Sequence, residues 1–319
     1  MNMRICLIGY LIFITLLSNA QSPVPEARSG HKMVFDQARQ IVILFGGWSA
    51  IKGFLGDTWT WNGEQWQKVC DTGPSPRSWY GMAYDTDQGK IVLFGGRDST
   101  GSQSMSDMWE WNGNNWKETT IKDGPEARDH FAMTYDQVRK RIVLHGGYDV
   151  KRNFDFADTW EWDGQTWIQQ ATSGPPMRGA HVMAFDERMQ KVLMFGGIDS
   201  SQTVFGGTWT WEGNEWRLLP IQEVEGRTHT SLVYNSKDAV LVRFGGKNES
   251  RTPFGDTWML NGTGWEQLNV TGPPARIDHG AAYDCKRMRM VLFGGKLPNP
   301  SKQQFDDTWE WNGRSWTKR

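Results

Sequence analysis

The sequence has little cysteine, no excess of charge of either sign and only one long apolar run. Of its three cysteines, Cys6 lies in the N-terminal apolar run, so only Cys70 and Cys285 remain for the body of the chain. The 35 Lys and Arg residues balance 36 Asp and Glu residues, and no basic stripe is present. The balanced charge excludes the electrostatic pattern of a nucleic-acid-binding protein.

The common catalytic motifs are also missing. The sequence contains no HExxH, GxSxG or CxxC motif and no phosphate-binding glycine loop, so we predict neither a cofactor nor catalytic residues. Cys70 and Cys285 fall at different points of the repeat described below, which favours two unpaired, buried thiols over a disulfide.

The N-terminus has the pattern of a secretory signal. Arg4 precedes the apolar run 6–17, and Ser18-Asn19-Ala20 offers the small residues of a cleavage site. The run is shorter than the ~20 residues of a transmembrane helix, although an uncleaved membrane anchor is an alternative. We therefore expect a signal peptide over residues 1–20, a secreted protein (extracellular or periplasmic) and no membrane span after cleavage.

Tryptophan and glycine, with 19 and 36 copies, are abundant and regularly spaced. A Gly-Gly pair ends a short β-branched apolar run six times, 49 to 51 residues apart, at Gly46-Gly47, Gly95-Gly96, Gly146-Gly147, Gly196-Gly197, Gly245-Gly246 and Gly294-Gly295. Such a run between turn residues predicts a strand.

A second block follows each Gly-Gly pair. It reads DTWTWNG from Asp57, DMWEWNG from Asp107, DTWEWDG from Asp158, GTWTWEG from Gly207, DTWMLNG from Asp256 and DTWEWNG from Asp307. Tryptophans two residues apart lie on one face of a strand, and Asn-Gly or Asp-Gly predicts a hairpin turn. A further tryptophan then opens a returning strand, at Trp66, Trp116, Trp167, Trp216, Trp265 and Trp316.

A third block precedes each Gly-Gly pair, with an arginine followed by a short apolar strand that ends at Asp or Asn. The arginines are Arg28, Arg77, Arg128, Arg178, Arg227 and Arg276. Each unit therefore holds four antiparallel strands, and six such units predict an all-β, six-bladed β-propeller. The blades are expected at about 28–75, 77–125, 128–175, 178–225, 227–274 and 276–319, within one domain over 21–319.

These motifs resemble the kelch repeat, and the resemblance covers residues 28–316. It implies that the first strand of each blade lines the central channel, as in the kelch propeller of galactose oxidase. Because the first and last repeats each hold all four strands, closure is expected through packing between blades, with residues 21–27 free to cover an edge.

Residues shared by all blades are interpreted as scaffold. We expect the six arginines to bond to carboxylates or carbonyls and to hold blades together, with Asp57, Asp107, Asp158, Asp256 and Asp307 as partners. A basic substrate clamp is the alternative for the arginines. The tryptophans are expected to pack between blades, and the Gly-Gly pairs to permit close backbone approach or a bulge.

Residues that depart from the repeat are candidate site residues. The alternative is that they reflect neutral sequence drift in a tolerant repeat. His145 stands where other blades have Phe45, Phe94 or Phe195, and Arg243 replaces an apolar residue. A buried arginine needs a partner, for which Glu223 and Glu225 are candidates. Further departures are Gly207 for aspartate, Leu260 for tryptophan and Asn235 for aspartate.

Five histidines follow the blade arginines by two or three residues, at His31, His130, His181, His229 and His279. Because neighbouring residues on a strand face opposite sides, they cannot all converge. We therefore expect structural histidines rather than a metal site.

The longest variable segments join the second and third strands and emerge on the same face as the links between blades. We call this side the loop face. Its residues that directly follow a Gly-Gly pair are candidate binding residues, namely Trp48, Arg97, Tyr148, Lys247 and Lys296.

Three functions are compatible with these features. The first is a non-catalytic recognition or scaffold module that binds an unknown protein or glycan through the loop face, as a monomer. The second, implied by the kelch resemblance, is a sugar-processing enzyme such as a mutarotase; a copper-radical oxidase is disfavoured by the placement of the cysteines. The third is a structural role in a larger secreted assembly.

Overall fold

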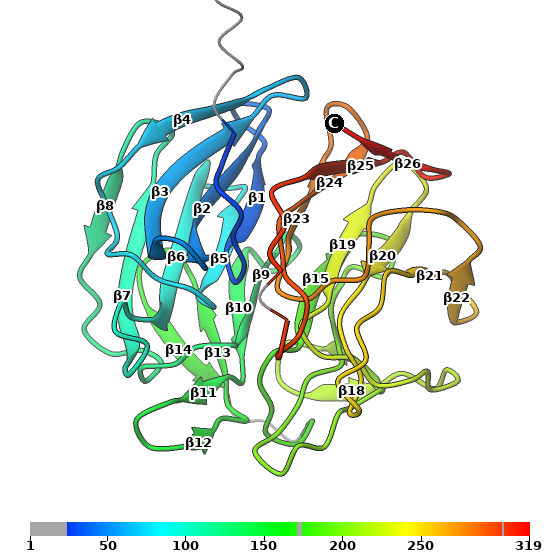
Figure 1. Cartoon of the computed structure of the whole chain (residues 1–319). Helices are drawn as coiled ribbons and strands as arrows, with labels where there is room; N and C mark the ends of the chain where they lie inside the picture. The colour runs from blue at the N-terminus through cyan, green and yellow to red at the C-terminus, as the bar shows by residue number, and fades with distance from the viewer. Residues whose placement is uncertain (1–23, 171–173, 302) are drawn as a thin grey trace, which may run out of the picture.

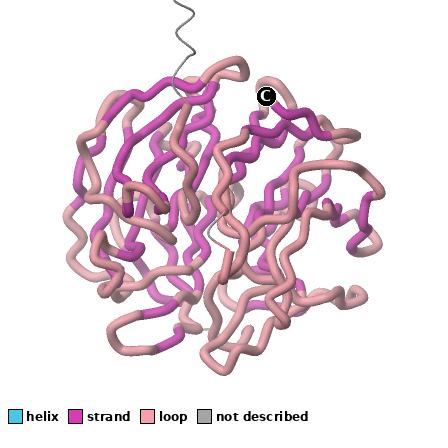
Figure 2. The backbone as a smooth tube through the Cα atoms, viewed as in Figure 1, coloured by secondary structure: helices cyan, strands magenta, loops and turns pink. Residues whose placement is uncertain are grey.

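The computed structural model describes residues 24–170, 174–301 and 303–319, and within these residues it contains strands and loops but no helix (Figure 2). The predicted signal peptide lies outside the described residues. No helix in the described part of the chain has the length and hydrophobicity needed to cross a membrane.

The strands form six four-stranded antiparallel sheets, each built from consecutive segments of the chain. The first three blades are β1–β4 (Lys32–Asp36, Ile41–Ser49, Gly53–Trp61, Trp66–Cys70), β5–β8 (Gly81–Asp85, Lys90–Arg97, Ser104–Trp111, Trp116–Thr119) and β9, β10, β13 and β14 (Ala132–Asp136, Arg141–His145, Thr159–Trp162, Trp167–Gln170). The last three are β15–β18 (Val182–Asp186, Lys191–Phe195, Thr208–Trp211, Trp216–Leu218), β19–β22 (Ser231–Asn235, Val240–Phe244, Thr257–Leu260, Trp265–Leu268) and β23–β26 (Gly280–Asp284, Arg289–Phe293, Thr308–Trp311, Trp316–Lys318). A small hairpin, β11 (Tyr148–Asp149) with β12 (Phe154–Asp155), extends the third blade.

The first strands of the blades stand around a common axis. They contact one another in the order β1, β5, β9, β15, β19, β23, and β23 contacts β1, so the ring is closed (Figure 1). The prediction of a six-bladed propeller with four-stranded blades is thus confirmed. The first and last blades exchange no strand, as the complete terminal repeats predict.

Tryptophans fill the space between blades. In five blades the last tryptophan of the third strand packs on the first tryptophan of the fourth strand, with ring centroids 5.3–5.6 Å apart. In every blade except the third, the fourth-strand indole also donates to a threonine hydroxyl of the preceding blade, as in Trp116 to Thr58 (2.9 Å). The same bond closes the ring, because Trp66 donates to Thr308 of the sixth blade (2.8 Å). In the third blade the Trp167 indole has no partner among the described residues, because Met108 stands at the threonine position.

Each blade arginine joins two blades through different atoms. Its carbonyl accepts a hydrogen bond from the second glycine of the preceding blade's Gly-Gly pair, at 2.8–3.0 Å in all six cases. Its guanidinium donates to the carbonyl of the first glycine in its own blade, at 2.9–3.3 Å. In five blades the guanidinium also forms a two-pronged ion pair with the aspartate two residues before the first tryptophan of the third strand, as in Arg77 with Asp107 (2.7 Å for both bonds). We call this set of bonds the arginine clamp.

The arginine clamp keeps its carboxylates ionised. Burial acts to raise the pKa of Asp107, but the hydrogen bonds and charge of Arg77 and the indole of Trp109 outweigh it, and the pKa lies below its usual value. Asp57, Asp158, Asp256 and Asp307 show the same balance. These are structural ion pairs, and their arginine side chains are at most 2% exposed.

The Gly-Gly pairs allow the close approach that the clamp requires. Gly46 and Gly47 have φ of 54° and 104°, a region that favours glycine. A Cβ at Gly47 would lie 2.9 Å from Cβ of His31 and 3.0 Å from the carbonyl of Ser29. The register of β2 against β3 also shifts at Phe45/Gly47, so both a bulge and close packing occur here.

Replacing a clamp aspartate should destabilise the whole ring. Asp107→Ala leaves the Arg77 guanidinium buried without its counter-ion, and we expect a loss on the order of 3 kcal/mol in the free energy of unfolding. Urea unfolding followed by tryptophan fluorescence measures it. The control is Asp71→Ala, which removes an exposed partner of Lys68 and should change stability by less than about 0.5 kcal/mol. Equal effects of the two substitutions would contradict the role assigned to the clamp.

Candidate functional site

A closed ring of backbone hydrogen bonds surrounds the propeller axis at the start of the first strands. The residue two positions after each blade arginine has a left-handed backbone, with φ between 53° and 69°. Each donates its N–H to the carbonyl of the equivalent residue in the preceding blade, at 2.6–3.2 Å. This axial ring consists of Gly30, Trp79, His130, Ala180, His229 and Asp278. Left-handed backbone is unfavourable for residues other than glycine, and the six mutual bonds hold it in place.

The axial ring places four aromatic or ionisable side chains, Trp79, His130, His229 and Asp278, close to the axis. The residue after each Gly-Gly pair bridges to the residue after each arginine, as Trp48 does with Ser29 and Lys247 with Thr228. The predicted mouth residues therefore encircle the same axis on the loop face. We call the combined set the loop-face mouth: Trp48, Trp79, Arg97, Asp129, His130, Tyr148, His229, Lys247, Asp278 and Lys296.

Asp129 anchors one side of the loop-face mouth. Its side chain is fully buried and accepts two hydrogen bonds from Arg97 at 3.0 and 3.1 Å. It also accepts a bond from Ser104 at 2.7 Å and contacts Nδ1 of His130. Burial acts to raise the pKa of Asp129, but the neighbouring imidazole and guanidinium lower it below its usual value. Arg97 and His130 are thereby held in fixed positions beside the axis.

Asp278 anchors the opposite side. It accepts a hydrogen bond from the indole of Trp79 at 3.2 Å, and it lies 3.4 Å from Nζ of Lys296 and 3.9 Å from Nε2 of His229. Although burial opposes ionisation, these cationic and polar neighbours hold the pKa of Asp278 well below its usual range. Burial lowers the pKa of His229 to about 3, so its imidazole is neutral at physiological pH.

Aromatic and cationic groups alternate at the surface of the mouth. Trp79 stacks on His130 with ring centroids 4.6 Å apart and an interplanar angle of 18°. The guanidinium of Arg97 lies 5.1 Å from the Trp79 ring centroid, and Nζ of Lys296 lies 5.7 Å from it and 5.9 Å from that of Trp48. Such an arrangement is suited to ligands that combine flat or apolar surface with negative charge.

Lys247 differs from the other two cations of the mouth because it has no carboxylate within ion-pair distance among the described residues. Its side chain is half-buried, and burial lowers the pKa of its ammonium group. The charge of Asp278 acts on Lys247 from beyond ion-pair distance, and Arg251 and Lys296 repel it. A half-buried cation with no close carboxylate is a natural position for an acidic group from a ligand.

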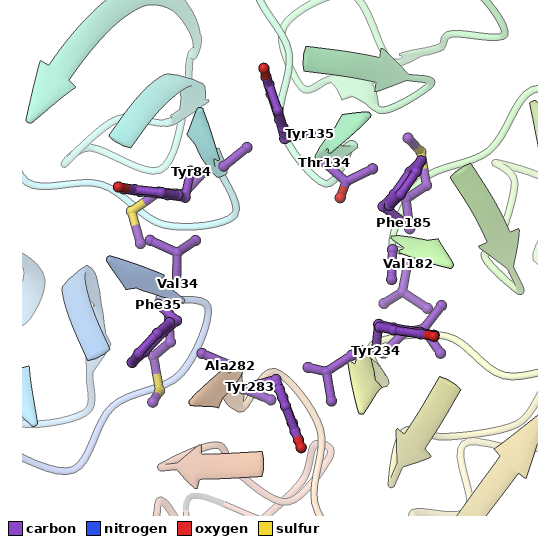
Figure 3. Close-up of a pocket in the computed structure, with 18 of the residues that line it drawn as sticks. Val34, Phe35, Tyr84, Thr134, Tyr135, Val182, Phe185, Tyr234, Ala282 and Tyr283 are labelled. Atoms are coloured by element: carbon purple, nitrogen blue, oxygen red, sulfur yellow. The ribbon is translucent and has the colours of Figure 1, made fainter. Parts of the chain in front are cut away.

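The other end of the axis opens into a wider channel. A cavity of about 270 Å³ is lined by the first strands and the turns that follow them. Figure 3 shows Val34, Thr134 and Ala282 around this opening, while the phenol oxygens of Tyr84 and Tyr283 point away from it. A second cavity of about 40 Å³ lies at the axial ring itself. The charged and aromatic groups described above therefore gather at the loop face.

The five histidines separate into two groups, as their two spacings from the arginine suggest. His130 and His229 belong to the axial ring, whereas His31, His181 and His279 are buried between blades, at 1%, 3% and 7% exposure. His31 packs on Phe293 and His279 on Phe244. No cluster of three potential metal ligands occurs among the described residues.

His145 and Arg243 do not reach the loop-face mouth. Both are buried, at 0% and 1% exposure. Nδ1 of His145 lies 2.9 Å from the Thr159 hydroxyl, and Arg243 is surrounded by the rings of Phe195, Trp258 and Trp265 at 4.3–5.0 Å. Neither proposed carboxylate partner bonds to Arg243, whose guanidinium has no hydrogen bond within the described residues. These two departures from the repeat replace core residues rather than form a binding site.

The two cysteines are unpaired. Cys70 is half-buried, and Cys285 is exposed beside the wide channel. The expectation of two buried thiols was therefore wrong for Cys285, because its position after the end of β23 places it in the turn to β24 rather than between blades.

Sequence reasoning did not find Trp79, Asp129 or Asp278. Their common signal is position relative to the blade arginine rather than residue type. Each lies one or two residues after a blade arginine, and this spacing is the sequence signal that could have identified them.

A closed ring of six four-stranded blades with Gly-Gly bulges and clamp arginines defines a kelch-type β-propeller. A family profile described as the KLHDC2/KLHL20/DRC7 Kelch-repeats domain matches residues 16–197, more than half of the chain. The chain belongs to the kelch-repeat family.

Similar proteins share parts of their length with this chain. Mei4-dependent protein 6 of Schizosaccharomyces pombe is 29% identical over 185 residues, which are 56% of this chain and 21% of that protein. Multiple epidermal growth factor-like domains protein 8 of Homo sapiens is 26% identical over 209 residues, which are 59% of this chain and 7% of that protein. The matched region thus spans about a fifth or less of these relatives.

The solved structure of YjhT superimposes with a TM-score of 0.70 and 12% sequence identity, and the match covers 93% of this chain and 99% of YjhT. At this identity the likeness shows the shared fold.

His145 should make the protein sensitive to mild acid. Burial, with the nearby charge of Arg178, lowers the pKa of His145 to about 3, so the unfolded chain takes up a proton below about pH 6.5 that the folded protein excludes. The contribution of the neutral His145 to the free energy of unfolding is therefore fully present above about pH 6.5, and it decreases as the pH falls from 6.5 toward 3. His145→Phe introduces the residue that other blades have at this position. The decrease in the free energy of unfolding between pH 7 and pH 5 should be about 2 kcal/mol smaller in this variant than in the wild type.

Urea unfolding at pH 7 and pH 5 measures this difference. The matched control is Phe94→His, which places an imidazole at the equivalent position of the second blade and should steepen the pH dependence. An unchanged pH dependence in His145→Phe would contradict the assignment of a buried neutral imidazole.

Proposed function

We propose that this chain is a non-catalytic recognition module that binds a protein or glycan partner through the loop-face mouth. The observation that carries the proposal is the convergence of three cations and three aromatic rings around one axis, at Arg97, Lys247, Lys296, Trp48, Trp79 and Tyr148. All six are half-buried, so each presents part of its surface to a ligand while the rest is fixed by neighbours. The kelch fold is consistent with a binding module, although fold alone does not define a ligand.

The chemistry of the mouth favours a partner that carries a negative charge. Arg97 and Lys296 are already paired with Asp129 and Asp278, so they contribute shape and hydrogen bonding more than free charge. Lys247 forms no ion pair among the described residues, and aromatic rings lie beside the other two cations of the same mouth. An acidic peptide or an acidic sugar would satisfy both features.

Charge reversal at Lys247 tests the proposal. Glycan-array binding and pull-down of partners with the full chain identify a ligand, and Lys247→Glu should then weaken its binding by at least about tenfold. Trp48→Ala should weaken it as well, through lost stacking area. The matched control is Lys237→Glu in the same blade, because Lys237 is exposed in the turn between β19 and β20 at the opposite end of the first strand.

The outcomes are distinguishable. Loss of binding in Lys247→Glu with unchanged binding in Lys237→Glu supports the loop-face mouth. Binding that survives both Lys247→Glu and Trp48→Ala, or that is lost only in Lys237→Glu, excludes it. Circular dichroism and the unfolding midpoint of each variant verify that the propeller is intact.

A second candidate function, a sugar mutarotase, rests on the two imidazoles of the mouth. His130 and His229 have ring centroids 5.6 Å apart, and each lies beside a carboxylate, which is an arrangement able to move protons at a sugar. Exchange NMR of sugar anomers with and without the protein tests this function. Enhanced anomer exchange that disappears in His130→Asn or His229→Asn would favour the enzyme over the recognition module.

A further inference from the structure

Five blades share a carboxylate site with three donors. In each, the clamp arginine donates from Nη1 and Nη2 to one aspartate, at 2.6–2.8 Å and 2.7–3.1 Å. The tryptophan two residues later donates its indole N–H to the same carboxylate at 2.7–2.8 Å. The five copies define the geometry and chemistry of the site, which accepts a carboxylate.

The fourth blade has the donors without the acceptor. Gly207 stands at the aspartate position, while Arg178 and Trp209 are both retained. Arg178 donates Nε to Pro176 at 3.0 Å and Nη1 to Gly196 at 2.9 Å. The hydrogen bonds of the Arg178 side chain within the described residues are these two, and no described residue accepts one from its Nη2 or from the Trp209 indole. Its counterparts form the same bonds, except that Nε of Arg227 has no partner among the described residues.

Arg178 is only 1% exposed and stacks on Phe205 at 4.0 Å, so it is a buried cation that lacks the paired aspartate of the other blades. Burial lowers its pKa to about 10, and the charge of Asp199, beyond ion-pair distance, acts in the opposite direction.

A small shift of one side chain would open the aspartate position at Gly207 to a carboxylate. A Cβ there would lie 3.0 Å from Cδ1 of Leu218 and 3.3 Å from the indole nitrogen of Trp209, which is closer than ordinary contact, so a carboxylate at this position requires the Leu218 side chain to move. Leu218 is 49% exposed, so its side chain can turn toward solvent. In the other blades the aspartates keep 10–27% exposure, so the equivalent position is reachable from solvent.

One acidic side chain of the protein competes for this position. Oε1 of Glu223 would lie 3.6 Å from the same Cβ, but Glu223 is exposed and forms no ion pair with Arg178 in the described structure. Glu223 belongs to the link that leads to the fifth blade, which differs from the other links. Its carboxylate lies near the position without occupying it.

We propose that the fourth blade binds a small carboxylate, such as formate or acetate, between Arg178 and Trp209 at the position that aspartate fills in the other blades. The ligand accepts two hydrogen bonds from the guanidinium and one from the indole, and it completes the arginine clamp of this blade. This site is separate from the loop-face mouth, and its test does not depend on the proposed function.

Thermal unfolding with added acetate tests the site. At pH 7 and constant ionic strength, replacing chloride by acetate should raise the unfolding midpoint of the wild-type chain in a saturable manner. Gly207→Asp supplies the carboxylate covalently, so it should raise the midpoint without ligand and abolish the response to acetate. Gly207→Ala, which adds only a methyl group, serves as the steric control and should not reproduce the stabilisation.

A second readout locates the ligand. Titration with acetate should shift one indole N–H signal in a 1H–15N spectrum, and that signal should be missing in Trp209→Phe and insensitive to acetate in Gly207→Asp. An equal response to acetate in wild type and Gly207→Asp would overturn the proposal. So would a response that appears only in Glu223→Gln, because Glu223 would then occupy the site in the wild-type protein.

Discussion

The propeller depends on arginines that bond to two blades at once. The main chain of each clamp arginine pairs with the preceding blade, and its side chain pairs with its own. A single residue therefore fixes the distance between neighbouring blades, and six repeats of that distance close the ring. Because the guanidinium is buried, its aspartate and glycine carbonyl partners are needed to compensate for the loss of hydration.

The proposed binding surface follows from this scaffold. Two residues after each arginine, the chain takes a left-handed backbone that completes the axial ring. The ring is formed by hydrogen bonds between backbone N–H and C=O groups alone, so the type of side chain can differ from one position to the next. The mouth of the propeller can thus carry Trp79, His130, His229 and Asp278 without changing the geometry that holds it. The scaffold is shared among the blades, whereas the chemistry at the axis is not.

Much of the fold was predictable because the scaffold is repeated. The period of the Gly-Gly pairs predicted six blades, and the paired recurrence of arginine and aspartate predicted partners for buried guanidinium groups. The axial ring could not be predicted, because its residues share a backbone conformation and no side-chain type. His145 and Arg243 were misplaced because a departure from the repeat does not reveal which side of the strand it occupies. The residues after the Gly-Gly pairs were correctly placed around the axis, because the Gly-Gly pair fixes where the chain goes next; their part in binding stays a prediction.

Hydrogen exchange at the six second glycines tests the central claim most directly. The amides of Gly47, Gly96, Gly147, Gly197, Gly246 and Gly295 each donate to the carbonyl of a clamp arginine. If the arginines hold one closed ring, these six amides should exchange slowly, with the same free energy of opening as global unfolding. Fast exchange at Gly295, where the sixth blade meets the first, would show a ring that opens at its junction and would contradict the account.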